Sequence, residues 1–294
     1  MEIKKHSIEV NGVNIVIHES GPGKSKIPLL LLHGGGLDSA LLSYGTIMSI
    51  LGEKYHVIAP DLPGYGESEK PEAPYTIEWY QEFLDDLIKV LGFNKINLGG
   101  LSLGGGIALG YSLKYPEKVK NLVLIAPYGL TDKIPYPQIT TWLMRHSGTY
   151  DWRNNLILSS KLLVKISLKR ILVNPQALND EVIDQLIKIG NIPDSGRAWR
   201  AFQLSEIENK NLRTCYLNQV HNLKMPVLLL TGKKDSLVPS TDVEMASELI
   251  PNSRRVEIEE CGHWLPRDRS PEFIKDVEDF LKSNILKKEY LCVF

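Results

Sequence analysis

The chain of 294 residues lacks an excess of charge of either sign, because 34 lysines and arginines are balanced by 35 aspartates and glutamates. It therefore lacks the excess of positive charge that would attract nucleic acids or anionic membranes. It also lacks an apolar run long enough to cross a bilayer, and its first residues lack the apolar block of a secretory signal. These absences predict a cytoplasmic protein with no nucleic-acid partner and no membrane partner.

Cysteine is scarce as well. The three cysteines are Cys215, Cys261 and Cys292, an odd number at spacings that match neither a disulfide framework nor a metal site. We therefore expect reduced thiols, as in a cytosolic protein, and no bound metal ion.

Short apolar runs and helix-period stretches alternate along most of the chain. Runs with the length of buried strands occupy 29–32, 57–59, 96–98, 122–125 and 227–230, and helical stretches occupy 77–91, 105–115 and 271–285. This alternation predicts an α/β fold with a mostly parallel central sheet flanked by helices. Asn11-Gly12, between two alternating runs, predicts an antiparallel hairpin before the first buried strand.

Residues 131–222 break this alternation. They show helical periodicity at 156–172 and 180–189, several prolines and three of the five tryptophans. We interpret them as a helical insertion that divides a core domain into residues 1–130 and 223–294.

The run Gly100-Leu101-Ser102-Leu103-Gly104 directly follows the strand at 96–98 and opens into a helix. A strand, a tight Gly-x-Ser-x-Gly turn and a helix form the context of a nucleophile elbow. The glycines remove side chains that would clash with the neighbouring strand and helix. Ser102 is therefore the predicted nucleophile, with a helix start behind it that favours developing negative charge.

A serine hydroxyl needs a base, because it is a poor nucleophile at neutral pH. His263 follows the predicted strand 255–258 and stands next to Gly262 in a loop, which makes it the candidate base. Asp235 follows the strand at 227–230 and would fix the tautomer of His263. Asp132, which follows the preceding strand at a greater distance, is the alternative acid.

The run His33-Gly34-Gly35-Gly36 follows the first buried strand. Its backbone N–H groups can approach a substrate carbonyl with no side chain in the way. We expect the N–H groups of Gly35 and Leu103 to form an oxyanion hole, with Gly36 as the alternative to Gly35. His33 is expected to hold the loop.

Together with Asp61 to Ser68, these motifs resemble the α/β-hydrolase family in their order along the chain. The resemblance implies a sheet of about eight strands, and it identifies residues 131–222 with the cap that shapes the acyl pocket. Serine at the elbow argues against the epoxide hydrolases and haloalkane dehalogenases of this family, which carry aspartate there.

Three kinds of serine hydrolase in this family fit the motifs to different degrees. The glycine loop and Gly262-His263-Trp264 resemble the meta-cleavage C–C bond hydrolases, but those enzymes typically read Gly-Asn-Ser-Met-Gly where this chain has Leu101 and Leu103. Proline iminopeptidases usually have a proline in the glycine loop and acidic residues in the cap, and neither is evident here. By elimination, the sequence predicts a serine esterase that cleaves a small to medium, apolar carboxylic ester through an acyl-enzyme.

Other functions stay open. C–C bond or amide hydrolysis is the alternative reaction, and a non-catalytic role in ligand binding is a further one, which the complete set of triad candidates disfavours. The ester mechanism needs no cofactor. Homo-oligomer formation is left open by the sequence.

The substrate pocket has weaker sequence signals. Trp142, Trp199 and Trp264 are candidates to line it, and Arg197 is a candidate to hold a substrate carboxylate. For each residue there is a structural alternative, since tryptophans also pack cap helices onto the sheet and arginines also cover solvated helix faces.

Overall fold

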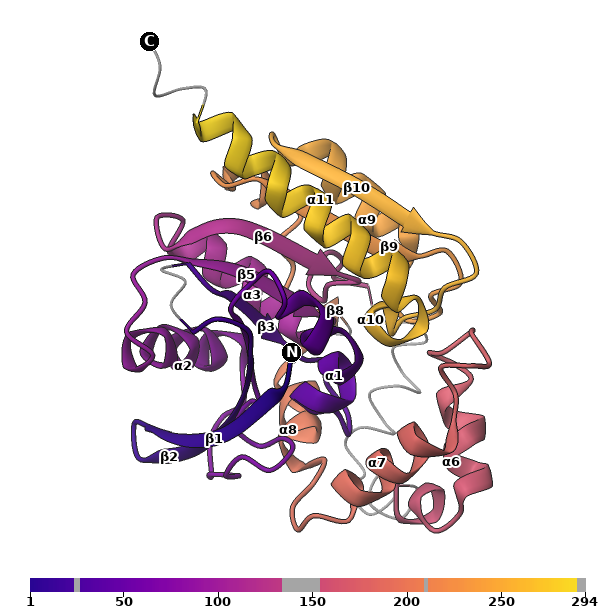
Figure 1. The fold of residues 1–294 in the computed structure, drawn as a ribbon. Coiled ribbons are helices and arrows are strands. Elements are labelled where there is room, and N and C mark those ends of the chain that lie inside the picture. The colour runs from indigo at the N-terminus through magenta and orange to yellow at the C-terminus, as the bar shows by residue number, and fades with distance from the viewer. Residues whose placement is uncertain (24–26, 134–153, 209–210, 290–294) are drawn as a thin grey trace.

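The computed structural model describes residues 1–23, 27–133, 154–208 and 211–289. Its centre is a twisted sheet of eight strands in the order β1-β2-β4-β3-β5-β6-β9-β10, with the first hairpin and β10 at opposite edges (Figure 1). The strands are β1 (Ile3–Val10), β2 (Val13–Ser20), β3 (Leu29–Leu32), β4 (Val57–Pro60), β5 (Ile96–Leu101), β6 (Val119–Ile125), β9 (Val227–Gly232) and β10 (Ser253–Ile258).

The sheet is antiparallel at one edge and parallel elsewhere. Strand β2 pairs antiparallel with β1 and β4, and all other pairs are parallel. The β1–β2 turn contains Asn11 and Gly12 at φ of 51° and 78°, as a tight hairpin turn requires. The predicted α/β fold with a mostly parallel sheet is therefore confirmed.

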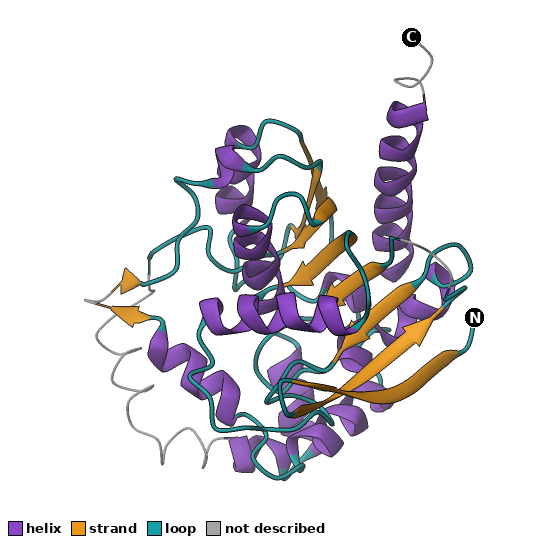
Figure 2. Cartoon of the chain, turned by 90° about the vertical axis from the view of Figure 1, so that its left-hand side faces the viewer, coloured by secondary structure: helices purple, strands orange, loops and turns teal. Residues whose placement is uncertain are grey.

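Helices cover both faces of the sheet (Figure 2). They are α1 (Ala40–Leu51), α2 (Ile77–Val90), α3 (Leu103–Lys114), α9 (Ser240–Leu249), α10 (Leu265–Asp268) and α11 (Ser270–Glu289). Their buried side chains form two apolar layers, one with α2, α3 and α9 and the other with α1, α10 and α11. Alternate strand residues fill the two layers, which explains why the strands read as continuous apolar runs. Among the described residues, no helix combines the length and the apolar content needed to cross a bilayer.

The described chain between β6 and β9 is mainly helical. It contains α6 (Lys161–Leu168), α7 (Asp180–Gly190), α8 (Arg197–Ser205), the short strands β7 (Ile207–Glu208) and β8 (Asn211–Leu212), and a 3-10 helix, η1 (Val220–Asn222). The stretch 156–172, expected as one helical unit, is broken before α6, because Ser160 adopts extended backbone at φ −144° and ψ 123°. Trp142 lies outside the described residues.

Candidate active site

Ser102 stands alone between the end of β5 and the start of α3, with φ 51° and ψ −113°. This conformation is rare for a residue with a side chain and stores strain. The turn is possible because the residues two positions before and after Ser102 are glycines: a Cβ on Gly104 would lie 2.3 Å from the Leu32 carbonyl oxygen, and one on Gly100 would lie 2.2 Å from the Gly104 carbonyl oxygen. The sequence thus forms the tight elbow that it predicts.

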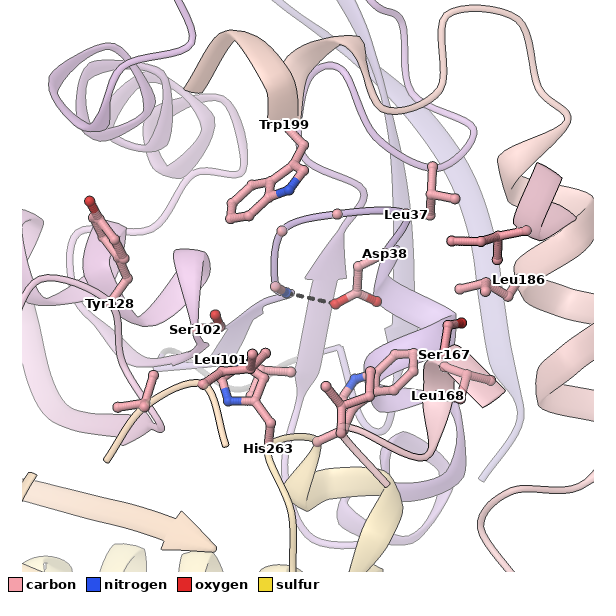
Figure 3. Close-up of a pocket in the computed structure, with 18 of the residues that line it drawn as sticks. Leu37, Asp38, Leu101, Ser102, Tyr128, Ser167, Leu168, Leu186, Trp199 and His263 are labelled. Carbon is pink, nitrogen blue, oxygen red and sulfur yellow. Dashed lines mark hydrogen bonds between the residues drawn. The ribbon is translucent and has the colours of Figure 1, made fainter. Parts of the chain in front are cut away.

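Hydrogen bonds hold the strained residue from both sides. The Ser102 N–H donates to the Ile125 carbonyl at 2.9 Å, and the Ser102 carbonyl accepts from the N–H groups of Gly106 and Tyr128, each at 2.9 Å. Because the backbone is fixed in this way, the side chain is directed into the cavity above the sheet (Figure 3).

His263 follows β10 and faces an acid from the loop after β9. Its Nδ1 lies 2.8 Å from Asp235 Oδ2, and the other oxygen of Asp235 accepts from the N–H groups of Leu237 at 2.7 Å and Val238 at 3.0 Å. The Asp235 side chain is completely buried. Because an ionised carboxylate only accepts, Nδ1 of His263 carries the proton and Nε2 is left free to accept one. Thus Asp235, rather than the alternative Asp132, contacts the histidine.

The glycine loop after β3 is fixed at two points. His33 Nε2 accepts from the Leu62 N–H at 3.0 Å, so its Nδ1 is protonated and donates to the Gly34 carbonyl at 2.8 Å. The Gly34 N–H donates to Asp38 Oδ2 at 2.8 Å. His33 therefore holds this loop, in agreement with the expectation from the sequence.

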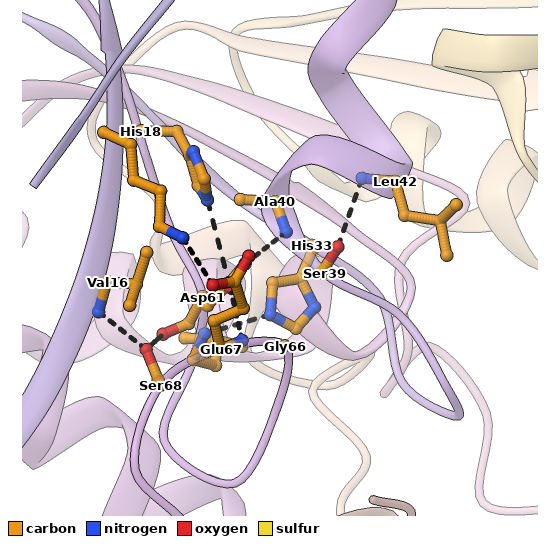
Figure 4. Close-up of polar contacts among 12 residues, drawn as sticks. Val16, His18, His33, Ser39, Ala40, Leu42, Asp61, Gly66, Glu67 and Ser68 are labelled. Atoms are coloured by element: carbon orange, nitrogen blue, oxygen red, sulfur yellow. Dashed lines mark hydrogen bonds and ion pairs between the residues drawn. The ribbon is translucent and has the colours of Figure 1, made fainter. Parts of the chain in front are cut away.

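A second buried network supports the same region (Figure 4). Asp61 accepts from the N–H groups of Ala40 and Glu67, each at 2.8 Å, which ties the start of α1 to the loop 61–68. Burial alone would raise the pKa of Asp61, but hydrogen bonding to His18 and to the two amides outweighs burial and lowers the pKa. These contacts give the Asp61 to Ser68 block a structural role, and Asp61 does not line the cavity.

The cavity has a volume of about 470 Å³, within the range of small-molecule sites. Of the candidate site residues, it brings together Ser102, His263, Gly35, Gly36, Trp199 and Trp264. Trp199 packs so closely on the glycine loop that a Cβ on Gly35 would lie 2.2 Å from its ring. Gly36 has φ 81°, which favours glycine. Leu103 is buried at the first position of α3, where backbone N–H groups have no partner within the helix.

Arg197 lies elsewhere. Its guanidinium donates to the backbone carbonyls of Lys70 and Pro71, which ties α8 to the loop before α2. No lysine or arginine is found among the described residues that line the cavity. The pairing of a cation with an aromatic at 197–199 therefore does not indicate a carboxylate clamp: α8 turns Trp199 inward and Arg197 toward a neighbouring loop.

Two polar residues of the cavity wall are not evident from the sequence motifs. Tyr128 donates its hydroxyl to Glu206 at 2.9 Å. Asp38 is 5% exposed, and burial raises the pKa of its carboxyl. One feature of the sequence points to Asp38, because it is an acidic residue two positions after the glycine run, in a segment with no other charged residue nearby.

Known proteins resemble this chain over nearly its whole length. A family model described as alpha/beta hydrolase fold matches residues 27–269. The 2-hydroxymuconate semialdehyde hydrolase of Pseudomonas putida is 27% identical over 273 residues, which cover 92% of this chain and 91% of that protein. The soluble epoxide hydrolase of Corynebacterium sp. strain C12 is 27% identical over 291 residues, covering 94% and 96%.

Solved structures agree with the family model. A serine hydrolase involved in carbazole degradation, the CarC enzyme, superposes with a TM-score of 0.77 at 26% identity, covering 96% of this chain and 99% of that chain. The family model covers well over half of the sequence, and the strand order, the elbow and the glycine loop fit it. The chain belongs to the alpha/beta hydrolase fold family.

Proposed function

We propose that the chain is a serine hydrolase that cleaves a small to medium, apolar carboxylic ester through an acyl-enzyme. One observation carries this proposal: the strained Ser102 lines a single, mostly apolar cavity together with His263, which pairs with the buried Asp235. Similarity to hydrolases over more than nine-tenths of the chain supports the general reaction class.

The proposed reaction uses residues already in place. His263 Nε2 takes the proton of the Ser102 hydroxyl as its oxygen attacks the acyl carbon, while Asp235 stabilises the imidazolium. The N–H groups of Leu103 and Gly35 bind the oxyanion. His263 then protonates the leaving alcohol, activates a water molecule against the acyl-enzyme, and returns the proton to Ser102 as the acid is released. No step is an oxidation or a reduction, and His263 and the backbone N–H groups carry the protons and stabilise the charge, so the proposed mechanism uses no cofactor.

Residues 131–222 act as the cap in this proposal. Their described helices supply apolar side chains to the cavity, among them Leu168, Leu186 and Trp199. Apolar walls keep water away from the developing charges and strengthen the hydrogen bonds to them. They also suit an alkyl or aryl acyl group better than a polar one.

C–C bond hydrolysis is the second candidate, because the 2-hydroxymuconate semialdehyde hydrolase is among the similar proteins. The name of its substrate denotes a carboxylate. Two features of this chain favour the ester: leucines flank Ser102, and no lysine or arginine is found among the described residues that line the cavity.

Hydrolysis of p-nitrophenyl esters from acetate to palmitate tests the proposal. We expect activity with a maximum at one chain length, and a loss of about 10⁴-fold or more in Ser102→Ala. Folded protein that is silent with all esters, or full activity in Ser102→Ala, would contradict it. Turnover of a 2-hydroxy-6-oxo-dienoate in place of esters would support C–C bond hydrolysis, and ligand binding without any turnover would support a binding protein.

A further inference from the structure

Asp38 is a buried carboxyl on the cavity wall that the proposed reaction does not use. It lines the same cavity as Ser102 and His263 (Figure 3). A side chain in this position faces any acyl group that reaches Ser102.

Asp38 accepts three hydrogen bonds, which oppose the rise in its pKa that burial causes. Its Oδ2 accepts from the Gly34 N–H at 2.8 Å and from the Ser43 hydroxyl at 2.6 Å, and its Oδ1 accepts from the Ser39 N–H at 2.7 Å. Trp264 Nε1 donates to the same Ser43 hydroxyl at 2.9 Å, and the Ser43 hydroxyl in turn donates to Asp38. All three partners are donors, and they favour the charged form of the acid.

The negative charge of Asp38 has no direct counter-ion. Among the described residues, no basic group lies within ion-pair distance of it. The His33 ring and the buried Arg267 act on it electrostatically from beyond that distance. The Arg267 Nε donates to the Leu42 carbonyl at 2.8 Å, and its guanidinium lies over the Trp264 ring, outside the set of cavity-lining residues. The cavity therefore presents the anion to a ligand while the cation stays behind Trp264.

We propose that Asp38 is a specificity-determining residue that excludes acyl groups carrying a negative charge. The inference rests on the proposed ester hydrolysis and narrows its substrates to esters whose acyl part is uncharged or cationic. The same carboxylate also positions the oxyanion loop through Gly34, so its two roles need to be separated by experiment.

The expected size of the effect follows from electrostatics. A like charge about 6 Å away, at an effective dielectric constant of about 20, corresponds to roughly a hundredfold change in affinity. Arg267 offsets part of this field. We therefore expect Asp38 to contribute about tenfold to the preference for a neutral over an anionic ester.

The test compares p-nitrophenyl hexanoate with mono-p-nitrophenyl adipate, two esters with six acyl carbons that differ in one terminal carboxylate. The wild-type protein is expected to prefer the hexanoate in kcat/KM, with the difference mostly in KM. In Asp38→Asn, the ratio of the two kcat/KM values should fall about tenfold, whatever happens to the absolute rates. Ser43→Ala is the matched control, since it removes one hydrogen bond from Asp38 but keeps the charge, and its ratio should stay at the wild-type value.

Several results would overturn the inference. Equal kcat/KM values for the two esters in the wild-type protein would already overturn it, with no variant needed. An equal loss of both activities in Asp38→Asn, with the ratio unchanged, would leave Asp38 only its support of the glycine loop. A ratio that falls as much in Ser43→Ala as in Asp38→Asn would assign the effect to loop geometry instead of charge.

Failure of ester hydrolysis itself is detected separately. If folded protein hydrolyses neither ester, the proposed function fails, and charge selection is then measured by binding. Hexanamide and adipic acid monoamide are titrated into Ser102→Ala, with the fluorescence of Trp199 and Trp264 as the signal. Weaker binding of the anionic amide that is relieved by adding Asp38→Asn supports the inference, and equal binding of the two amides contradicts it.

Discussion

The inner wall of the cavity carries reactive polar side chains that are held by hydrogen bonds, whereas the described part of the outer wall presents mainly apolar side chains. The inner wall consists of the loops that follow β3, β5, β9 and β10 and carries Ser102, Asp38 and His263. The outer wall consists of the described helices between β6 and β9 and carries mainly Leu168, Leu186 and Trp199. Each wall is assigned a different part of the proposed function.

The difference follows from how the two walls are built. Parallel strands bring their carboxyl ends to one edge of the sheet, so residues far apart in sequence converge there with fixed geometry. Helices packed through apolar side chains have no comparable register, and they tolerate changes of size and shape more readily. Substitutions of Ser102, His263 or Asp235 should therefore abolish the reaction, while those in the outer wall should change the preference for the size and shape of the acyl group.

The largest of these effects is expected for Asp235→Asn, in the inner wall. An asparagine amide directed at His263 Nδ1 would donate where the carboxylate accepts, and it would favour the tautomer that cannot take the Ser102 proton. We expect kcat for the best p-nitrophenyl ester to fall about 10³- to 10⁴-fold with little change in KM.

Asp132→Asn serves as the matched control, since Asp132 follows the neighbouring strand but does not contact His263. It should retain nearly full activity. A large loss in Asp132→Asn together with a small loss in Asp235→Asn would reverse the assignment of the acid.

The candidate triad could be predicted from the sequence because each of its residues lies within a few positions of a strand end. Ser102 directly follows β5, and both Asp235 and His263 follow short loops after β9 and β10. The three residues come together because parallel strands align their carboxyl ends, and the continuous apolar runs in the sequence indicate a parallel sheet. The elbow is also local, since its glycines are required by backbone contacts within the turn and with β3.

The outer wall could be predicted only in part, because its geometry depends on contacts between distant segments. Arg197 looked like a substrate contact, but its guanidinium binds carbonyls more than 120 residues earlier in the chain. The position of Asp38 has the same cause: its carboxyl accepts a hydrogen bond from Ser43, whose hydroxyl accepts from Trp264, 221 residues further on. Neither of these long-range contacts produces a periodicity or a short motif in the sequence.

Gly35→Ala tests the place where the two walls meet. The added Cβ would lie 2.2 Å from the Trp199 ring, so either the loop or the ring must move. A displacement of about 1 Å in a catalytic loop can cost about a hundredfold in rate, and we expect kcat to fall by about ten- to a hundredfold.

Trp199→Ala in the same chain should restore much of this loss, because it removes the atoms that collide with the new methyl group. Kinetics of the two single variants and of the double variant form a cycle that measures this coupling. Strictly additive losses would show that the inner wall does not depend on the outer wall at this point.

Arg197→Met should have the smallest effect on kcat/KM. It tests whether charge selection belongs to the inner wall alone. The substitution keeps much of the apolar stem but removes the hydrogen bonds to Lys70 and Pro71, with an expected loss of about 1–3 kcal/mol in the free energy of unfolding. Since the guanidinium faces the loop before α2, kcat/KM should fall by no more than about threefold, and equally for p-nitrophenyl hexanoate and mono-p-nitrophenyl adipate. A selective loss with the adipate would place Arg197 in contact with substrate and give the outer wall a role in charge selection. An equal, small loss would leave that selection to Asp38 in the inner wall.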